Sequence, residues 1–259
     1  MDRYQPVTAS EIAPVSSAAF GAALSEANTQ GVDPGPPAHG RAAEESATGP
    51  AAPMRRAVTG EDAHEVLAFL GQRYSMGPKY LGSAAPSQQE LLRAVAIALR
   101  APDHGQLRPF RFVRVGDAQR ERLAGLFARD AARRGHSAVE VERARQRAYN
   151  GPALLAVLGR VRPNVEDVPE HEQWACIGAG MMNLLNALHL MGYGAKILSG
   201  ASVRDPEIQA SFCRTGETLV SWILAGTPTC GARPKQPDEV QAALSDWIET
   251  APQMPGERT

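Results

Sequence analysis

Four short apolar runs of strand type alternate with longer stretches of helical spacing, and this alternation limits the folds open to the chain. Residues 110–115 (FRFVRV) alternate apolar and polar side chains as a strand does, and 154–158 is an apolar run that indicates a buried strand. Residues 195–198 and 219–225 give two further strands. Helical spacing covers residues 60–71, 87–100, 117–149 and 171–191. This order predicts an α/β or α+β sandwich.

Two of the helices carry a start signal in the sequence. Thr59 with Asp62, and Ser87 with Glu90, have the spacing of a capping box ahead of an apolar run. Pro102 then ends the second helix, because proline cannot continue the helical hydrogen bonds. These signals fix the expected helix starts near residues 60 and 88.

The composition changes near residue 58, which sets the boundary of the folded part. Before it, Ala, Gly, Pro and Ser dominate and large apolar residues are sparse, so burial cannot offset the entropy lost on ordering the chain. We therefore expect residues 1–57 to be a disordered extension, with an ordered arm that wraps the body as the alternative. Residues 58–250 are expected to form the folded domain, and 251–259 a flexible tail.

Charge and cysteine content argue against several classes of protein. The 259 residues carry 27 basic and 28 acidic side chains, and a net charge of −1 does not suit a nucleic-acid or membrane-surface binder. The three cysteines, Cys176, Cys213 and Cys230, are scattered and odd in number, which favours a reducing compartment over a disulfide scaffold. Because no targeting segment and no run of about 18 apolar residues occurs, we expect a cytoplasmic protein.

Several residues that could carry chemistry are better explained by packing. Gly178-Ala179-Gly180 resembles half of a dinucleotide fingerprint, but it lies inside a helical pattern, where small residues let neighbours approach closely. His171, Glu172 and His189 make a poor metal set, and His189 is expected to be a satisfied core histidine. The cysteines are expected to fill the core, and the arginines of 117–149, interleaved with acids, to form a solvated face.

Two polar segments stand out from this background. Residues 72–79 (QRYSMGPK) follow a helix and bring arginine, serine and lysine together, which suits a phosphate because the guanidinium fork matches phosphate oxygens. Residues 100–110 (RAPDHGQLRPF) lie between a buried helix and a strand, and their side chains can donate to a polar heterocycle or its phosphate. Taken alone, each segment is equally well explained as a turn.

Taken together and in order, these segments resemble the nitroreductase family, and within it the small YdjA-like branch. The resemblance rests on R-x-S at 73–75 and on R-A-P-D-H-x-Q-x-R-P-F-R-F at 100–112. Residues 168–174 (VPEHEQW) resemble the family's V-P-x-W-E-Q stretch, and 192–200 (GYGAKILSG) its G-x-G-x-x-W-x-S-G segment. Residues 224–228 (LAGTP) resemble its late strand ending in G-T-P. The resemblance covers residues 62–240.

The resemblance implies both a fold and an activity. The fold is an α+β sandwich, with a central mixed or antiparallel sheet flanked by helices, that forms an intertwined homodimer. The activity is that of an FMN enzyme, in which NAD(P)H gives a hydride to the flavin and a nitroaromatic, quinone or related acceptor then takes two electrons. This ping-pong cycle demands no side-chain acid or base, so no catalytic side chain is expected.

The resemblance also implies which residues hold the flavin, which is expected at the dimer interface. One subunit is expected to supply Arg73, Tyr74 and Ser75, and its partner Arg100 and His104, with Arg108 as a further candidate. The isoalloxazine ring is expected against Ile197, Leu198 and Ser199, and the phosphate near Gly226. Arg233 or Lys235 are candidates for extra phosphate ligands.

Three departures from the family pattern bear on flavin binding. Tyr74 stands where the family usually has Arg or His, which removes a cationic contact, and Phe110 replaces the usual Trp. Ile197 and Leu198 replace a Trp-Arg pair, which makes the pocket wall less polar. Two alternatives therefore remain: a non-catalytic flavin-binding or regulatory protein on the same fold, and a flavin-free protein.

Overall fold

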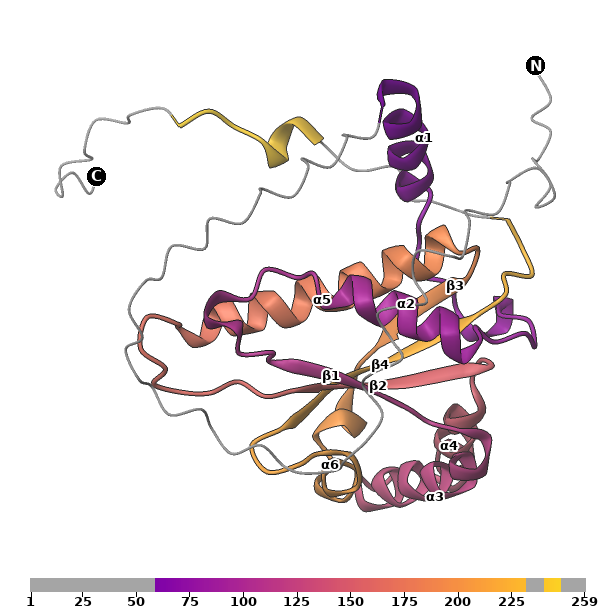
Figure 1. Cartoon of the computed structure of the whole chain (residues 1–259). Helices are drawn as coiled ribbons and strands as arrows, with labels where there is room; N and C mark the ends of the chain where they lie inside the picture. Colours follow the sequence, from indigo (N-terminus) through magenta and orange to yellow (C-terminus); the bar gives the residue numbers. More distant parts are fainter. Residues whose placement is uncertain (1–58, 232–239, 248–259) are drawn as a thin grey trace, which may run out of the picture. The chain divides into compact units, whose positions relative to one another are not determined.

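The central sheet has four strands in the order β1-β2-β4-β3, and every neighbouring pair is antiparallel (Figure 1). The computed structural model describes residues 59–231 and 240–247. In that part of the chain the strands are β1 (Phe110–Arg114), β2 (Ala153–Gly159), β3 (Gly194–Leu198) and β4 (Thr218–Gly226). The four predicted strands are confirmed, and the sheet is antiparallel rather than mixed. The predicted extension 1–57, the tail 251–259, Arg233 and Lys235 lie outside the described residues.

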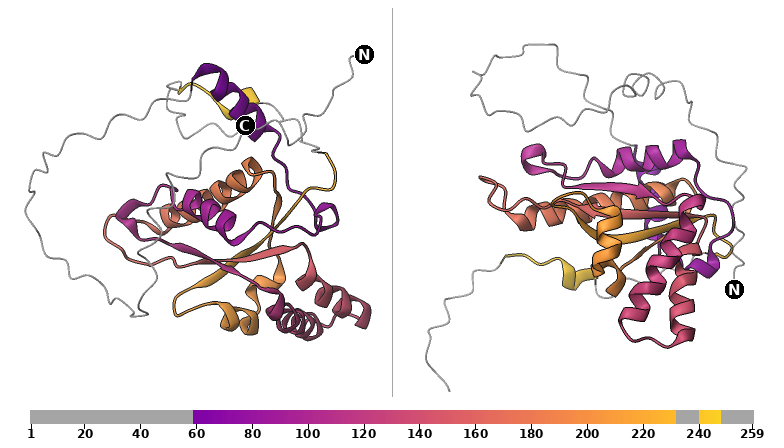
Figure 2. Two further views of the ribbon diagram at one scale, coloured as in Figure 1. Left: turned by 45° about the vertical axis from the view of Figure 1, so that its right-hand side comes forward. Right: turned by 90° about the horizontal axis from the view of Figure 1, so that it is seen from below.

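Helices cover both faces of this sheet (Figures 1 and 2). Leu155 and Val157 of β2 pack in one core with α2 and α5, whereas Leu154, Ala156 and Leu158 pack in a second core with α3, α4 and α6. The alternation follows from the two-residue period of a strand. The helices are α1 (Gly60–Gly71), α2 (Gln88–Ala98), α3 (Asp117–Arg133), α4 (Ala138–Gln146), α5 (Glu170–Leu190) and α6 (Pro206–Phe212). The predicted α+β sandwich is therefore confirmed.

The helical stretch predicted over 117–149 is divided, which corrects the sequence analysis. Gly135 has a φ of 75°, a left-handed conformation that ends α3 at low cost only for glycine. Ser137 then caps α4, because its hydroxyl accepts from the Glu140 backbone N–H (3.4 Å) while the Glu140 carboxylate accepts from the Ser137 backbone N–H (2.9 Å). The stretch thus becomes the α3–α4 hairpin.

The two predicted capping boxes differ in outcome. Ser87 and Glu90 form the complete reciprocal box at the start of α2. Thr59 precedes α1 as predicted, but its hydroxyl donates to the Asp62 carboxylate (2.7 Å) and does not cap the backbone. The position of the helix start was therefore predicted correctly at both sites, and the capping geometry only at Ser87.

Arg120 shows that the arginines of α3 are only in part a solvated face. Its side chain is buried, and it donates to the carbonyl oxygens of Ala148 (2.6 Å), Gly151 (3.3 Å) and Pro152 (3.2 Å). Burial lowers the pKa of its guanidinium group. Arg120 therefore ties α3 to the backbone that leads into β2, and the prediction of a solvated arginine was wrong here.

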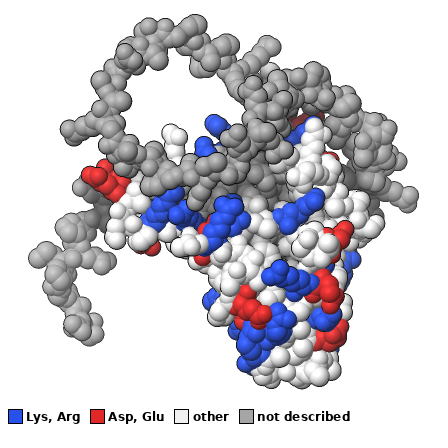
Figure 3. Space-filling model, turned by 60° about the horizontal axis from the view of Figure 1, so that its bottom comes forward, with Lys and Arg blue, Asp and Glu red and all other residues white. Residues whose placement is uncertain are grey.

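Other arginines of α3 join it to α6. Arg129 and Arg133 both donate to Glu207, and Arg133 also reaches the buried Asp205 (2.6 Å). The Asp205 carboxylate caps α6 by accepting from two backbone N–H groups. Figure 3 shows side chains of both charges side by side at this end of the molecule. Paired charges of this kind hold the hairpin against α6.

Gly180 of α5 confirms the packing explanation of the Gly178-Ala179-Gly180 sequence. An added Cβ at Gly180 would overlap the buried ring of Phe110 on β1, whereas one at Gly178 would meet nothing within 4 Å. The helix lies this close to the sheet because residue 180 has no side chain.

We predict that Gly180→Ala lowers the free energy of unfolding by about 1–3 kcal/mol, because the Phe110 ring must shift within a filled core. Gly178→Ala is the matched control, and it should leave stability unchanged or raise it by up to about 1 kcal/mol through helix propensity. Urea denaturation of both variants checks this. Equal stability of the two would contradict the close contact.

Candidate functional site

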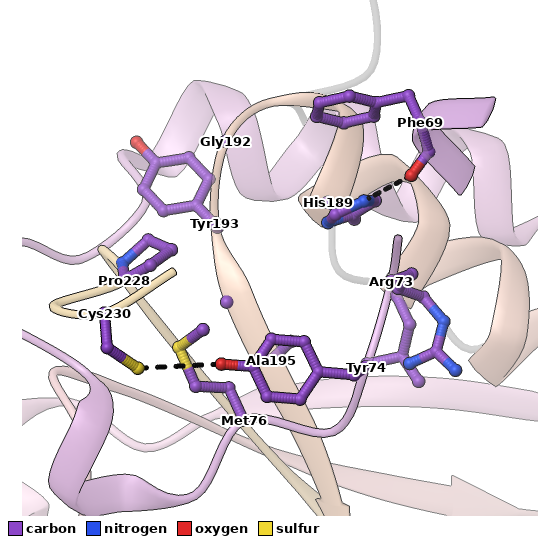
Figure 4. A pocket seen from close by; sticks show the side chains of 12 residues that line it. Phe69, Arg73, Tyr74, Met76, His189, Gly192, Tyr193, Ala195, Pro228 and Cys230 are labelled. Atoms are coloured by element: carbon purple, nitrogen blue, oxygen red, sulfur yellow. Dashed lines mark hydrogen bonds between the residues drawn. The ribbon is translucent and has the colours of Figure 1, made fainter. Parts of the chain in front are cut away.

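A cavity of about 150 Å³ lies where the loop after α1, the end of α5 and the start of β3 meet (Figure 4). Its walls come from distant parts of the sequence: Phe69, Arg73, Tyr74, Met76, Leu185, His189, Gly192, Tyr193, Gly194, Ala195, Pro228 and Cys230. Pockets that bury a cofactor-sized ligand measure about 300–1,000 Å³. The cavity is therefore large enough for only part of such a ligand.

The loop that carries Arg73, Tyr74 and Ser75 is fixed to the outer edge of β3. Ser75 forms a parallel bridge with Ala195, and the backbone N–H of Met76 donates to the Ala195 carbonyl (3.1 Å). The Met76 side chain is buried over Gly194, where an added Cβ would lie 2.5 Å from the sulfur. This contact explains the glycine and holds Arg73 beside the cavity.

Beyond Ala195 the outer edge of β3 has no strand partner among the described residues. Backbone groups of alternate strand residues point to the same edge, so Ile197 presents its N–H and C=O on the side where Ala195 binds Met76. The side chains of Ile197 and Leu198 are half-buried, and Ser199 is exposed. The side chains of Ile197 and Leu198 pack toward opposite faces of the sheet, against the two different cores, so they lie on either side of this edge.

The hydroxyl of Tyr74 is directed to the chain segment after β4. It lies 3.4 Å from the Gly231 carbonyl oxygen. It also lies 3.7 Å from the Cys230 sulfur, the contact drawn in Figure 4. Cys230 is half-buried and lines the cavity, so its expected role as core filler was wrong. Cys176, in contrast, is buried in the core, and burial raises the pKa of its thiol to about 11.

His189 has a hydrogen-bond partner, as expected, but it also lines the cavity. Its Nε2 lies 2.8 Å from the Phe69 carbonyl oxygen, and its ring stacks on the Phe69 ring with centroids 4.5 Å apart. A carbonyl only accepts, so Nε2 carries the proton. Tyr193 lines the same cavity, and its pKa is raised by burial and by a hydrogen bond to Glu90.

The second polar segment forms a strained loop between α2 and β1. Gln106 and Arg108 have φ values of 51° and 47°, which non-glycine residues adopt only when their surroundings require it. The Asp103 carboxylate accepts from the backbone N–H groups of Leu107 (3.0 Å) and Arg108 (2.8 Å). No role was predicted for Asp103, although an aspartate at the head of a glycine-containing loop is a turn signal.

Three predicted site residues lie in this segment, and one of them, His104, has a side-chain partner. The exposed His104 places its Nδ1 2.8 Å from the Glu172 carboxylate at the start of α5. An ionised carboxylate only accepts, so Nδ1 carries the proton and Nε2 remains for another contact. Arg100 and Arg108 are exposed near it in sequence.

The structure does not bring the two groups of predicted ligands together within one chain. His104 contacts α5 at Glu172. Phe69 contacts the same helix at His189, which lines the cavity beside Arg73. At 1.5 Å per residue, these positions lie about 25 Å apart along the helix. Gly226 pairs with Gly194 at the end of β4, and an added Cβ would lie 2.5 Å from Pro152, so packing by itself accounts for this glycine.

A family model described as the nitroreductase family matches residues 70–226, which is more than half of the chain. The chain belongs to the nitroreductase family. Among curated proteins, "Putative NAD(P)H nitroreductase YdjA" of Escherichia coli (strain K12) is 28% identical over 149 residues, which cover 57% of this chain and 81% of that protein. The resemblance drawn from the sequence is confirmed, and membership of the nitroreductase family supports an oxidoreductase.

Solved structures agree with this nitroreductase fold. A nitroreductase-like family protein from Bacillus cereus has a TM-score of 0.59 at 18% identity, over 76% of this chain and 100% of its own. A variant of the "FMN and NADPH-dependent nitroreductase NfnB" from Sphigopyxis sp. strain HMH has a TM-score of 0.54 at 18% identity, over 73% and 99%. Within the described ranges, no helix combines the length and apolar character needed to cross a bilayer.

We predict that Asp103→Ala loosens the 103–108 loop, because two backbone N–H groups lose a charged acceptor and the left-handed residues lose their restraint. The free energy of unfolding should fall by about 1–3 kcal/mol. Asp103→Asn, which keeps one acceptor oxygen, should lose less. Hydrogen exchange of the Leu107 and Arg108 amides is the direct measurement, and unchanged protection in Asp103→Ala would contradict this role.

Proposed function

We propose that the chain is an FMN-dependent NAD(P)H oxidoreductase that acts as a homodimer on nitroaromatics, quinones or related acceptors. The proposal rests on the separation of the two ligand groups along α5. About 25 Å of helix prevents one chain from closing both groups on one flavin. In a two-fold dimer, the Arg73 end of one chain can meet the Arg100 end of its partner, and the reverse contact forms a second equal site.

The exposed surface of α2 and α5 supports this assembly. Trp174 of α5 is 44% exposed, and further large apolar side chains are exposed along the same two helices: Leu92, Ile97, Met182 and Leu190. Large apolar side chains exposed on two neighbouring helices favour an interface there. A second copy of the chain that covers α5 also brings the opposite ends of the two α5 helices together.

The residues at the β3 end suit FMN in their chemistry. Arg73 and Ser75 can donate to a phosphate, and the cavity beside Arg73 gives part of the room. The backbone N–H and C=O of Ile197, which have no strand partner in the part of the chain that the structure describes, match a heterocycle edge that carries both acceptors and a donor. The apolar side chains of Ile197 and Leu198 flank this edge. Tyr74 directs its hydroxyl to Cys230 and Gly231, so it joins this wall without adding a charge.

The bound flavin would supply the redox chemistry, accepting a hydride from NAD(P)H and passing two electrons to the acceptor after the nucleotide has left. The protein would bind the flavin and orient it. Arg73 would neutralise phosphate charge, and the partner subunit's Glu172 would hold the partner subunit's His104 ring by its Nδ1–H, which leaves Nε2 for a contact with the flavin. The apolar β3 wall limits water beside the ring. We further propose a cytoplasmic location, because all three cysteines are free thiols.

The visible absorption spectrum of the purified protein, saturated with FMN and kept anaerobic, tests the proposal. We expect a protein-bound flavin band that bleaches with NADPH or NADH and returns when a nitroaromatic or a quinone is added. A band that persists with both nucleotides would indicate a flavin-binding protein without this activity. Absence of binding after incubation with FMN would overturn the proposal.

Mixed dimers test the shared site. Arg73→Ala and Arg100→Ala should each weaken FMN binding in both sites by about 10- to 100-fold, the loss expected for one charged contact. A heterodimer of the two variants, isolated with two affinity tags, has one site with both defects and one intact site. It should therefore bind about half the FMN of the wild type with wild-type affinity. If both sites of the heterodimer bind FMN as weakly as the single variants do, the two arginines belong to a site within one chain.

A further inference from the structure

A second hollow, of about 250 Å³, lies between the α3–α4 hairpin and the loop that follows β3. Ser199 and Ser202 line it from the loop, and Arg134, Arg143 and Arg147 line it from the hairpin and from the short 3₁₀ helix η4 (Arg147–Tyr149). Ser199 also ends the β3 edge that forms the wall of the proposed flavin site. The hollow therefore begins where that site ends.

The acidic groups of this hollow already have partners. Asp130 accepts from Arg134 (2.6 Å), whose other nitrogen donates to the Ala201 carbonyl oxygen (2.8 Å). Glu140 accepts from the Ser137 backbone and hydroxyl and lies 3.6 Å from His136. The charge of Asp130 is thus paired with Arg134, whereas Glu140 keeps its negative charge among neutral donors, which lower its pKa.

Arg143 and Arg147 remain without a carboxylate partner among the described residues. They lie four residues apart, so they face the same side of the helix, where two like charges repel each other. Arg145, between them in sequence and on the opposite side, pairs with Glu121. The lining of the hollow carries three arginines against two carboxylates, so one positive charge is in surplus, and Arg143 and Arg147 donate to neither carboxylate.

The loop wall suits a ligand that approaches closely. Gly200 has a φ of 151° and a ψ of −165°, a conformation that is essentially limited to glycine, and an added Cβ there would meet nothing within 4 Å. Packing therefore does not explain the glycine. Between Ser199 and Ser202 the wall carries no side chain larger than the methyl group of Ala201, and Arg143 and Arg147 line the same hollow.

We propose that this hollow binds the oxyanion group, a phosphate or a carboxylate, of a substrate whose reacting part lies against the β3 edge. Two guanidinium forks and two hydroxyls are the donor set for such a group. The inference rests on the proposed function for the position of the reacting part, and it names the chemical class of substrate: one that carries a negative charge beside its redox-active ring.

The double variant Arg143→Gln/Arg147→Gln tests the site, with Arg145→Gln as the matched control on the same helix. Pyrophosphate is the binding probe, measured by calorimetry on protein saturated with FMN so that the flavin phosphate site is filled. We expect the dissociation constant for pyrophosphate to rise about tenfold in the double variant and to stay within about twofold in the control. FMN content and melting temperature should match the wild type.

Steady-state kinetics then identify the source of the oxyanion. If the double variant raises the KM for NADPH but not for NADH, the hollow binds the 2′-phosphate of NADPH. If it raises the KM for both nucleotides, the hollow binds their shared pyrophosphate. If it raises the KM for nitrobenzoate but not for nitrobenzene, the hollow binds the carboxylate of the acceptor. Each of these results supports an oxyanion site, and in each case we expect kcat to stay unchanged. Equal pyrophosphate affinity in the double variant and the control would overturn it. Because that binding measurement needs no turnover, it is decisive even if the proposed reductase activity fails.

Discussion

Burial of the two central strands on both faces is the constraint on which the rest of the fold depends. β2 is buried along its whole length and β4 along most of it, so helices must cover the sheet on either side. Their backbone groups are used within the ladder. Only the edge strands β1 and β3 can offer backbone donors and acceptors to anything else, and the loop 72–76 already occupies the start of the β3 edge. The remaining β3 edge has no strand partner among the described residues, and it is the edge that the proposed flavin site uses.

The length of α5 has a second consequence, because the helix separates the two groups of polar residues. Glu172 near its start holds His104, and His189 near its end contacts Phe69 beside the Arg73 cavity. Gly180, between them, lets the helix approach the sheet closely, which fixes both ends relative to the strands. For the proposed function, this separation favours a site built from two copies of the chain, with the apolar side chains of α2 and α5 between them.

The α3–α4 hairpin combines a structural and a proposed binding role. Arg120 ties it to the backbone before β2, while Arg129 and Arg133 tie it to α6. These bonds hold the hairpin beside the loop 199–202. The two arginines left at the hollow are thus carried on a fixed support, which is the condition for recognising an oxyanion by geometry as well as by charge.

Local patterns in the sequence determined most of the secondary structure and the order of the site segments. The strand positions follow from apolar runs, and the starts of α1 and α2 follow from Thr59 and Ser87, because these signals act within a few residues. The family resemblance follows from short strings such as 100–112. Even the break between α3 and α4 has a local signal in Gly135 and Ser137, which the prediction of one helical stretch overlooked. Only the tertiary structure decided the contacts between distant residues. These are Tyr74 with Cys230 and Gly231, His189 with Phe69, and Arg120 with the carbonyl groups that accept its hydrogen bonds. Side-chain type and spacing cannot specify these partners, because they meet only once the strands have paired and the helices have packed on both faces of the sheet.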